Sequence, residues 1–152
     1  GEYNVVRPYT YAHRRSRTSY SHFGQALAHP LGSNFKEYIG IARYQLFERI
    51  GVTGKLVYTN IGLDSTDTNW GQHILFDYTS REQDYNNTIG QGFNTDILYL
   101  DMTTSYMFKH NWFIDAKVVY RKESSELEVY NYDTFFFTLG LRCNVALRDY
   151  SY

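Results

Sequence analysis

The fold is decided by a stretch that reads Trp112-Phe113-Ile114-Asp115-Ala116-Lys117-Val118-Val119-Tyr120-Arg121-Lys122. From Trp112 to Tyr120 every even position is apolar, whereas four of the six odd positions from 113 to 123 are charged. Successive side chains of a β-strand point to opposite faces, so this alternation predicts a strand with one apolar and one polar face. A helix would distribute the same charges around its surface.

The same period of two recurs along the chain. We expect further strands over residues 36–46, 52–62, 98–108 and 135–147, and a weaker one over residues 2–12 that Pro8 interrupts. With the first stretch these make six strands of about 10–13 residues, whereas strands of soluble proteins usually have about 5–6. A tilted strand needs about 9–11 residues to cross a bilayer, so the lengths favour membrane strands.

The connections between the expected strands alternate in length. Residues 47–51 and 109–111 are short turns, whereas residues 13–35, 64–93 and 124–133 are long loops. Short periplasmic turns opposite long extracellular loops are typical of outer-membrane β-barrels, and about eight strands is the smallest number that closes one. We therefore expect an all-β fold, an antiparallel transmembrane β-barrel. Residues 1–152 would form the C-terminal part, the last six or so strands, of a single larger barrel domain.

Aromatic side chains mark two depths on the apolar faces. Near the short turns lie Tyr44, Tyr106, Phe108 and Trp112; near the long loops lie Tyr38, Tyr58, Tyr120, Phe135 and Phe137. Two such belts suit the two membrane–water interfaces. The alternative is a tyrosine-rich soluble core, in which each buried hydroxyl needs a partner.

The polar faces carry the charges. They are Glu37, Arg43, Lys55, Asp101, Asp115, Lys117, Arg121, Glu123 and Arg142, five positive minus four negative, or +1. A Lys or Arg facing lipid costs about 2–4 kcal/mol at the midplane, so this face must contact water or paired charge. The near-balance favours a narrow or plugged lumen crossed by salt bridges.

Composition excludes several classes of function. Lys plus Arg total 15 and Asp plus Glu total 16, so the formal net charge is -1. Because a duplex-binding domain shows a basic excess, no nucleic-acid partner is expected.

The single cysteine, Cys143, excludes an internal disulfide and a cysteine-based zinc site. Residues 1–17 lack the charged region and the following apolar region of a signal peptide. No apolar run of the sequence is long enough for a transmembrane helix.

No catalytic or cofactor motif is present in the sequence. There is no His-Glu-x-x-His, Gly-x-Ser-x-Gly or P-loop pattern. Residues 64–69 offer oxygen ligands but lack the glycine and distal glutamate of a calcium loop. We expect a non-enzymatic protein without cofactor or metal. A membrane hydrolase that uses Ser21 and His22 is the remaining catalytic alternative, although no spacing selects these residues.

One basic cluster stands out in the first long loop. Arg14, Arg15 and Arg17 lie in the run His13–Arg17, close to Tyr20. Guanidinium groups pair with anions such as acidic polysaccharide or lipopolysaccharide phosphate. We predict a surface glycan or anion site at Arg14, Arg15, Arg17, Tyr20 and Trp70. A solvated loop, or salt bridges between loops, is the alternative.

Several stretches resemble a known family. They are Pro8-Tyr9-Thr10-Tyr11-Ala12-His13, the core Leu27-Ala28-His29-Pro30-Leu31-Gly32-Ser33-Asn34 within residues 20–37, Asn69-Trp70-Gly71, and the aromatic chain end at residues 148–152. They resemble the C-terminal region of Bacteroidota outer-membrane barrels, the capsule-assembly Wzi-like proteins and their gliding-motility-associated relatives.

The resemblance implies a role at the cell surface. Wzi-like proteins are implied to be large barrels of around eighteen strands that act as surface lectins and help to anchor capsular polysaccharide. We expect a bacterial outer-membrane location with extracellular long loops and a periplasmic C-terminus. The expected partners are membrane lipid and lipopolysaccharide, surface polysaccharide, and other outer-membrane proteins in a surface assembly. An outer-membrane pore or transport protein is the alternative function.

Overall fold

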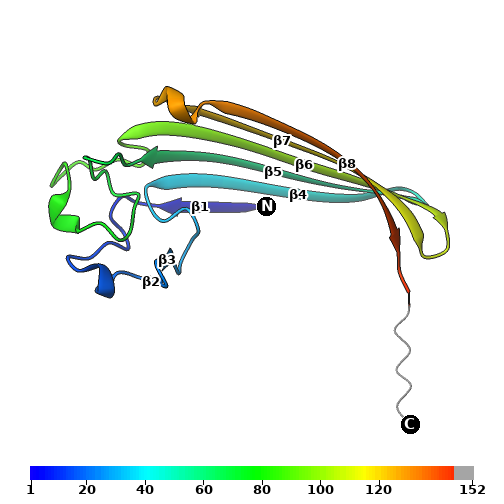
Figure 1. The fold of residues 1–152 in the computed structure, drawn as a ribbon, viewed down its shortest axis with the longest axis horizontal. Coiled ribbons are helices and arrows are strands. Elements are labelled where there is room, and N and C mark those ends of the chain that lie inside the picture. Colours follow the sequence, from blue (N-terminus) through cyan, green and yellow to red (C-terminus); the bar gives the residue numbers. More distant parts are fainter. Residues whose placement is uncertain (146–152) are drawn as a thin grey trace, which may run out of the picture.

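A computed structural model describes residues 1–145, and six strands of these residues form one antiparallel sheet (Figure 1). In sheet order the strands are β1 (Glu2–Val6), β4 (Phe35–Phe47), β5 (Ile50–Leu63), β6 (Phe93–Lys109), β7 (Trp112–Ser125) and β8 (Tyr132–Cys143). The prediction of an all-β antiparallel fold is confirmed. Within residues 1–145 the sheet is open, with β1 and β8 at its edges. The predicted end of the last strand, residues 146–147, and the aromatic chain end lie outside the described residues.

Two tight turns connect long strands at one end of the sheet. Glu48 and Arg49 join β4 to β5, and His110 and Asn111 join β6 to β7. Asn111 has a φ of 63°, in the left-handed region that asparagine tolerates better than most residues. The three long connections lie at the other end of the sheet, as the sequence predicts.

The first strand and the first long loop differ from the prediction. β1 ends at Val6 rather than continuing to residue 12, because Pro8 lacks an N–H to pair and Tyr9 turns the chain with a φ of 63°. The loop that follows contains a short helical turn, Ser16–Thr18, and a small hairpin of β2 (Ser21–His22) and β3 (Gln25–Ala26) that the sequence pattern does not predict.

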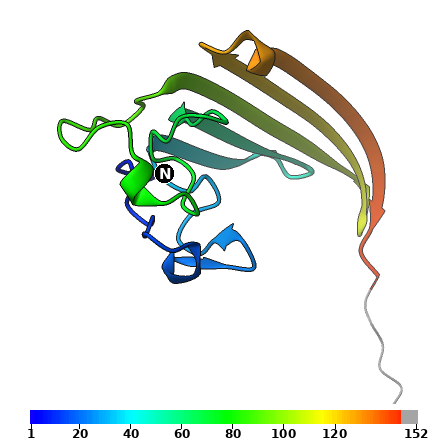
Figure 2. The ribbon, with the colours of Figure 1, turned by 60° about the vertical axis from the view of Figure 1, so that its left-hand side comes forward.

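Register places most of the charged residues of the strands on one face of the sheet. Lys55 pairs with Asp101, Arg121 with Tyr99, and Asp115 with Ser105. We call this the polar face and the opposite one the apolar face. Figure 2 shows the sheet curved, with the first two long loops on its concave side and the connection between β7 and β8 at the upper end of the sheet. His29 of the first loop contacts Glu37, so the loops cover the polar face near the loop end.

The buried core is small and lies at the loop end. Within residues 1–145 the buried apolar side chains are Phe35, Ile61 and Ile74, and buried polar residues outnumber them. The apolar face is exposed along most of its length, with Leu141 75% exposed. No helix of the described part of the chain has the length and apolar character needed to cross a membrane. The ordered loop end therefore holds the candidate site.

Candidate functional site

Asn34 joins the first loop to two other segments. Its side-chain amide donates to the carbonyl oxygens of Gly62 (2.9 Å) and Gln91 (2.8 Å), and its Oδ1 accepts from the N–H of Gly90 (2.8 Å). The residue is fully buried and has a φ of 62°, which asparagine tolerates. One side chain thus fixes the end of the first loop against β5 and against the segment that leads into β6.

Asp64 folds the second loop around its carboxylate. Its two oxygens accept hydrogen bonds from the backbone N–H groups of Trp70 (2.5 Å), Gln72 (3.1 Å) and His73 (2.7 Å). The Asp64 carboxylate of the calcium candidate at residues 64–69 is therefore used within the loop. No cluster of three or more His, Cys, Asp or Glu side chains that could hold a metal is present among residues 1–145.

Tyr9 connects the two loops to each other. Its hydroxyl donates to the carbonyl oxygen of Asn69 (2.7 Å), and its backbone N–H donates to the carbonyl oxygen of Gly71 (3.0 Å). Burial is the main reason that the pKa of the Tyr9 hydroxyl lies above its ordinary value. Asn69 in turn donates to the Asp77 carbonyl (3.0 Å) and to Ser80 Oγ (2.9 Å), so the loops form one hydrogen-bonded cluster.

His29 attaches the first loop to the sheet. Its Nε2 lies 3.1 Å from Glu37 Oε2, and its ring packs on Phe35 with ring centroids 4.5 Å apart. Its Nδ1 accepts from the N–H of Leu31 (3.3 Å), so the neutral tautomer that donates from Nε2 satisfies both contacts. The buried Glu37 also accepts from Asn4 (3.1 Å). This histidine has a structural role.

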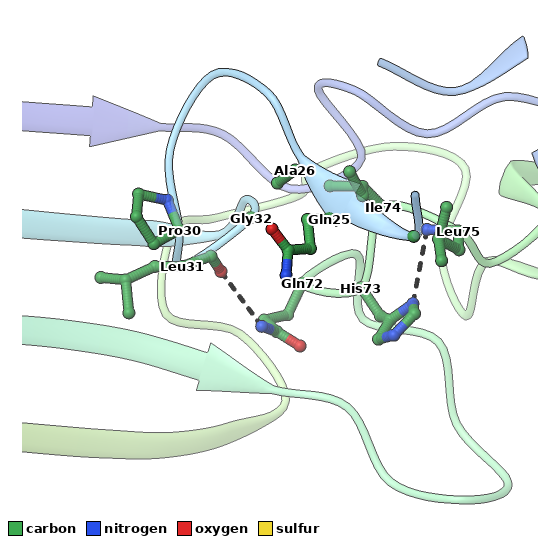
Figure 3. A pocket seen from close by; sticks show the side chains of 10 residues that line it. Gln25, Ala26, Pro30, Leu31, Gly32, Gln72, His73, Ile74 and Leu75 are labelled. Carbon is green, nitrogen blue, oxygen red and sulfur yellow. Dashed lines mark hydrogen bonds between the residues drawn. The ribbon is translucent and has the colours of Figure 1, made fainter. Parts of the chain in front are cut away.

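A pocket of about 480 Å³ lies between the β2–β3 hairpin and the second loop (Figure 3). Its polar side chains are Gln25, Gln72 and His73, and its apolar wall consists of Ala26, Pro30, Leu31, Ile74 and Leu75, with Gly24 and Gly32 completing the lining. Gln72 Nε2 donates to the Leu31 carbonyl (3.1 Å), which connects the two walls. His73 Nδ1 accepts from the N–H of Leu75 (3.4 Å).

The predicted basic run lies on the surface of the first loop. Arg14, Arg15 and Arg17 are exposed, and no ion pair of theirs occurs among the described residues. The pKa of Asp77 in the second loop is lowered, chiefly by hydrogen bonds from Thr79, with the charge of Arg14 contributing. The run therefore remains available for an external anion.

The structure brings only part of the predicted site together. Tyr20 is exposed beside the run, and its ring lies 5.7 Å from that of Tyr11. Trp70 is half-buried instead, and a Cβ at Gly92 would lie 2.7 Å from its Cγ, so its ring packs on the Gly92 backbone. Trp70 contributes to the loop cluster rather than to an open surface beside the arginines.

Ion pairs cross the polar face of the sheet. Lys117 Nζ lies 2.8 Å from Asp101 Oδ2, Arg142 Nε lies 2.8 Å from Asp115 Oδ2, and Arg121 Nη2 lies 2.8 Å from Glu123 Oε2. Each pair joins charges that the alternation assigns to one face. The pairing neutralises most of the charge on this face.

Sequence reasoning missed the residues that build the loop cluster and the pocket. Asn34 and Asp64 form hydrogen bonds with backbone groups, and such partners cannot be recognised from the types of residue in the sequence. Gln25, Gln72 and His73 belong to no motif. Asn34 does end the Leu27–Asn34 core that carries the family resemblance, and His29 lies within it. Comparisons with models of protein families, with curated proteins and with solved structures find no match.

Proposed function

We propose that this chain forms part of the wall of a bacterial outer-membrane β-barrel that holds surface polysaccharide or serves as a subunit of a surface assembly. The observation that carries the proposal is the exposed apolar face of the sheet. Its middle has no charged side chain, and aromatic residues stand at both of its ends. At the loop end these are Tyr3, Tyr38, Tyr58, Tyr120, Phe135 and Phe137; at the turn end they are Tyr44, Tyr106, Phe108 and Trp112.

The spacing of the two aromatic rows supports a bilayer. On β7, Tyr120 and Trp112 bound the apolar stretch, and eight residues at about 3.3 Å each separate them by about 26 Å along the strand. A strand tilt of about 40° reduces this to about 20 Å of depth, close to the apolar band of about 25 Å in outer-membrane barrels. An exposed apolar face of this extent would promote aggregation in water, whereas in a bilayer it contacts lipid.

The charges at the border of the apolar face fit the same proposal. Lys36, Asp96, Lys122 and Asp133 all lie at the loop end of that face. Near the interface, charged side chains facing lipid cost only about 0–1 kcal/mol. This arrangement supports a membrane–water interface at the loop end of the sheet.

A pore is the second candidate function, and the polar face argues against it. The pairs of Lys117 with Asp101 and of Arg142 with Asp115 neutralise charge that would otherwise attract permeating ions. Loops that fold over the concave side also support a closed lumen. Single-channel conductance in planar bilayers separates the two functions, because a steady large conductance would favour the pore.

The loops supply the part of the proposal that concerns polysaccharide. They form one hydrogen-bonded cluster that presents the unpaired arginines of the basic run and a pocket at the surface. Such a cluster positions polar groups rigidly, as ligand sites require. The proposed role is one of binding, without catalysis.

Cell fractionation and capsule retention test the proposed function. We expect the protein in the outer-membrane fraction of a density gradient, with the heat-modifiable gel mobility of a barrel. Cells that lack it should release capsular polysaccharide into the medium. Recovery of the protein in the soluble fraction would contradict the barrel. Normal capsule retention with correct localisation would leave the surface-assembly role and remove the polysaccharide role.

A further inference from the structure

We propose that the pocket between the β2–β3 hairpin and residues 72–75 binds an uncharged sugar ring, and that Phe23 stacks on that ring. The inference rests on the proposed role in polysaccharide binding and adds the chemical class of the ligand. It differs from the prediction of an anionic glycan at the basic run, because it concerns another surface of the loop cluster.

The composition of the pocket selects against charged ligands. No Asp, Glu, Lys or Arg side chain lines it. An anionic sugar would need charge-assisted partners such as a guanidinium group, and without them its desolvation is costly. Neutral amides and an imidazole instead match hydroxyl groups, which both donate and accept hydrogen bonds.

The polar atoms of the pocket have unused hydrogen-bonding capacity. Within residues 1–145 the side-chain amide of Gln25 has no hydrogen-bond partner, and Gln72 uses its Nε2 for the Leu31 carbonyl while its Oε1 has none. His73 uses Nδ1 to accept from Leu75, which places the proton of the neutral ring on Nε2 as a donor. The pocket thus offers two amide groups and one N–H to the hydroxyls of a single ring.

The aliphatic side chains of the pocket suit the apolar side of a sugar. Pro30 and Leu31 lie on one side and Leu75 on the other, with Gln25 and Gln72 between them (Figure 3). A volume of about 480 Å³ falls within the range of about 300–1,000 Å³ for ligand pockets. Sugar rings have polar rims and apolar faces, so a pocket divided between amides and aliphatic carbon fits their chemistry.

Phe23 supports the inference independently of the pocket lining. It stands at the tip of the hairpin with a φ of 49°, followed by Gly24 with a φ of 75°, and Gly24 itself lines the pocket. A two-residue turn with both φ values positive favours Asn-Gly, so phenylalanine is strained there. The ring is also 92% exposed, so it gains little from burial. Phe23 directly precedes Gly24 of the pocket lining, and its ring lies edge-on to that of His22, with ring centroids 4.4 Å apart. A ligand in the pocket that stacks on Phe23 would explain a strained and exposed aromatic residue at this position.

Titration of the purified protein in detergent micelles tests the inference. The probes are polysaccharides from cells that carry the protein, prepared separately from capsule and from lipopolysaccharide, and each divided by anion exchange into a neutral and an acidic fraction. We expect binding of a neutral fraction. The capsule and lipopolysaccharide arms identify the source of the sugar.

Two variants and one matched control make the test specific. Phe23→Asn should weaken binding of the neutral fraction about tenfold, while the hairpin stays folded because asparagine tolerates a positive φ. Gln25→Ala should weaken it about two- to tenfold through lost hydrogen bonds. Tyr85→Asn, a change at an 82% exposed tyrosine outside the pocket, should have no effect.

The outcomes separate this inference from the proposed function. Binding of the acidic fractions alone, or neutral binding that neither pocket variant weakens, would overturn the sugar pocket and leave the polysaccharide role standing. Failure of every fraction to bind would overturn both the sugar pocket and the polysaccharide role. An unfolding temperature of Phe23→Asn equal to or above that of the native protein would show that its loss of binding does not come from misfolding.

Discussion

Two consecutive valines of β7 provide a sharp test of the membrane proposal. Val118 lies on the apolar face between Met102 and Phe137, whereas Val119 lies on the polar face between Asp101 and Phe136. Replacing either one with arginine makes the same chemical change on the same central strand. The two variants differ only in the face that receives the charge.

The register gives the expected size of the effect. Val118 is two residues, or about 6.6 Å, from the middle of the stretch between Trp112 and Tyr120. At a tilt of about 40° this is about 5 Å from the midplane, so the cost of arginine should be near the lower end of the range of about 2–4 kcal/mol. About 2 kcal/mol corresponds to an approximately 30-fold shift of the folding equilibrium. Val119→Arg should cost less than about 0.5 kcal/mol, because the polar face contacts water in this proposal and a charge there is not transferred to lipid; Asp101, opposite Val119, already pairs with Lys117.

Urea titration of the protein folded into lipid vesicles measures both free energies of unfolding. Heat-modifiable gel mobility gives the folded fraction at each urea concentration. Equal destabilisation by the two arginines, or a larger effect at Val119, would refute the assignment of the faces. Trp fluorescence quenching by brominated lipid adds a direct control once the native Trp70 and Trp112 have been replaced with phenylalanine. In that background a tryptophan placed at 118 should be quenched and one at 119 should not.

Three further predictions follow from the loops, the turns and the open edges. Asn34→Ala leaves buried backbone partners unsatisfied at a cost of about 1–3 kcal/mol each, so limited proteolysis should cleave the long loops faster; unchanged cleavage would contradict its role. A cysteine at Asp67 should react with an impermeant maleimide on whole cells, while one at Asn111 and the native Cys143 should not, and the reverse pattern would invert the topology. Residues 1–152 expressed alone should not give a soluble monomer, because edges and apolar face stay uncovered; a monodisperse, cooperatively melting sample would count against the membrane proposal.

Alternation in the sequence was sufficient to predict the sheet. The middle of each strand has one apolar and one polar face, so a period of two identifies it without knowledge of its neighbours. The start of β6 could not be predicted from alternation, because the strand begins at Phe93 rather than at residue 98. Asn94, Thr95 and Asp96 near its start place polar side chains on both faces and form pairs such as Asn60 with Asp96 and Thr95 with Ser125. Hydrogen bonds to the neighbouring strands therefore extend β6 beyond the stretch in which apolar and polar residues alternate.

The candidate site could be predicted only in part. A run of arginines beside a tyrosine is visible in a short stretch of sequence, so the basic run and Tyr20 could be predicted. Both are exposed in the structure. Trp70 was predicted as part of the same site, but it is half-buried and packs on the Gly92 backbone instead. The pocket was missed because Gln25 and Gln72 come together only after Asn34 and Asp64 have folded loops that are distant in sequence.

The tight turns and the second loop also have a consequence for the order of folding. The β4–β5 and β6–β7 hairpins each close across two residues, so their contacts form at little entropic cost. Joining β5 to β6 must instead close a loop of about thirty residues, which costs about 2 kcal/mol more than a two-residue turn. The hydrogen bonds of Asn34 and Asp64 offset this cost only once the loop is ordered. The two hairpins should therefore appear early in refolding and their union late, with loop ordering as the slow step.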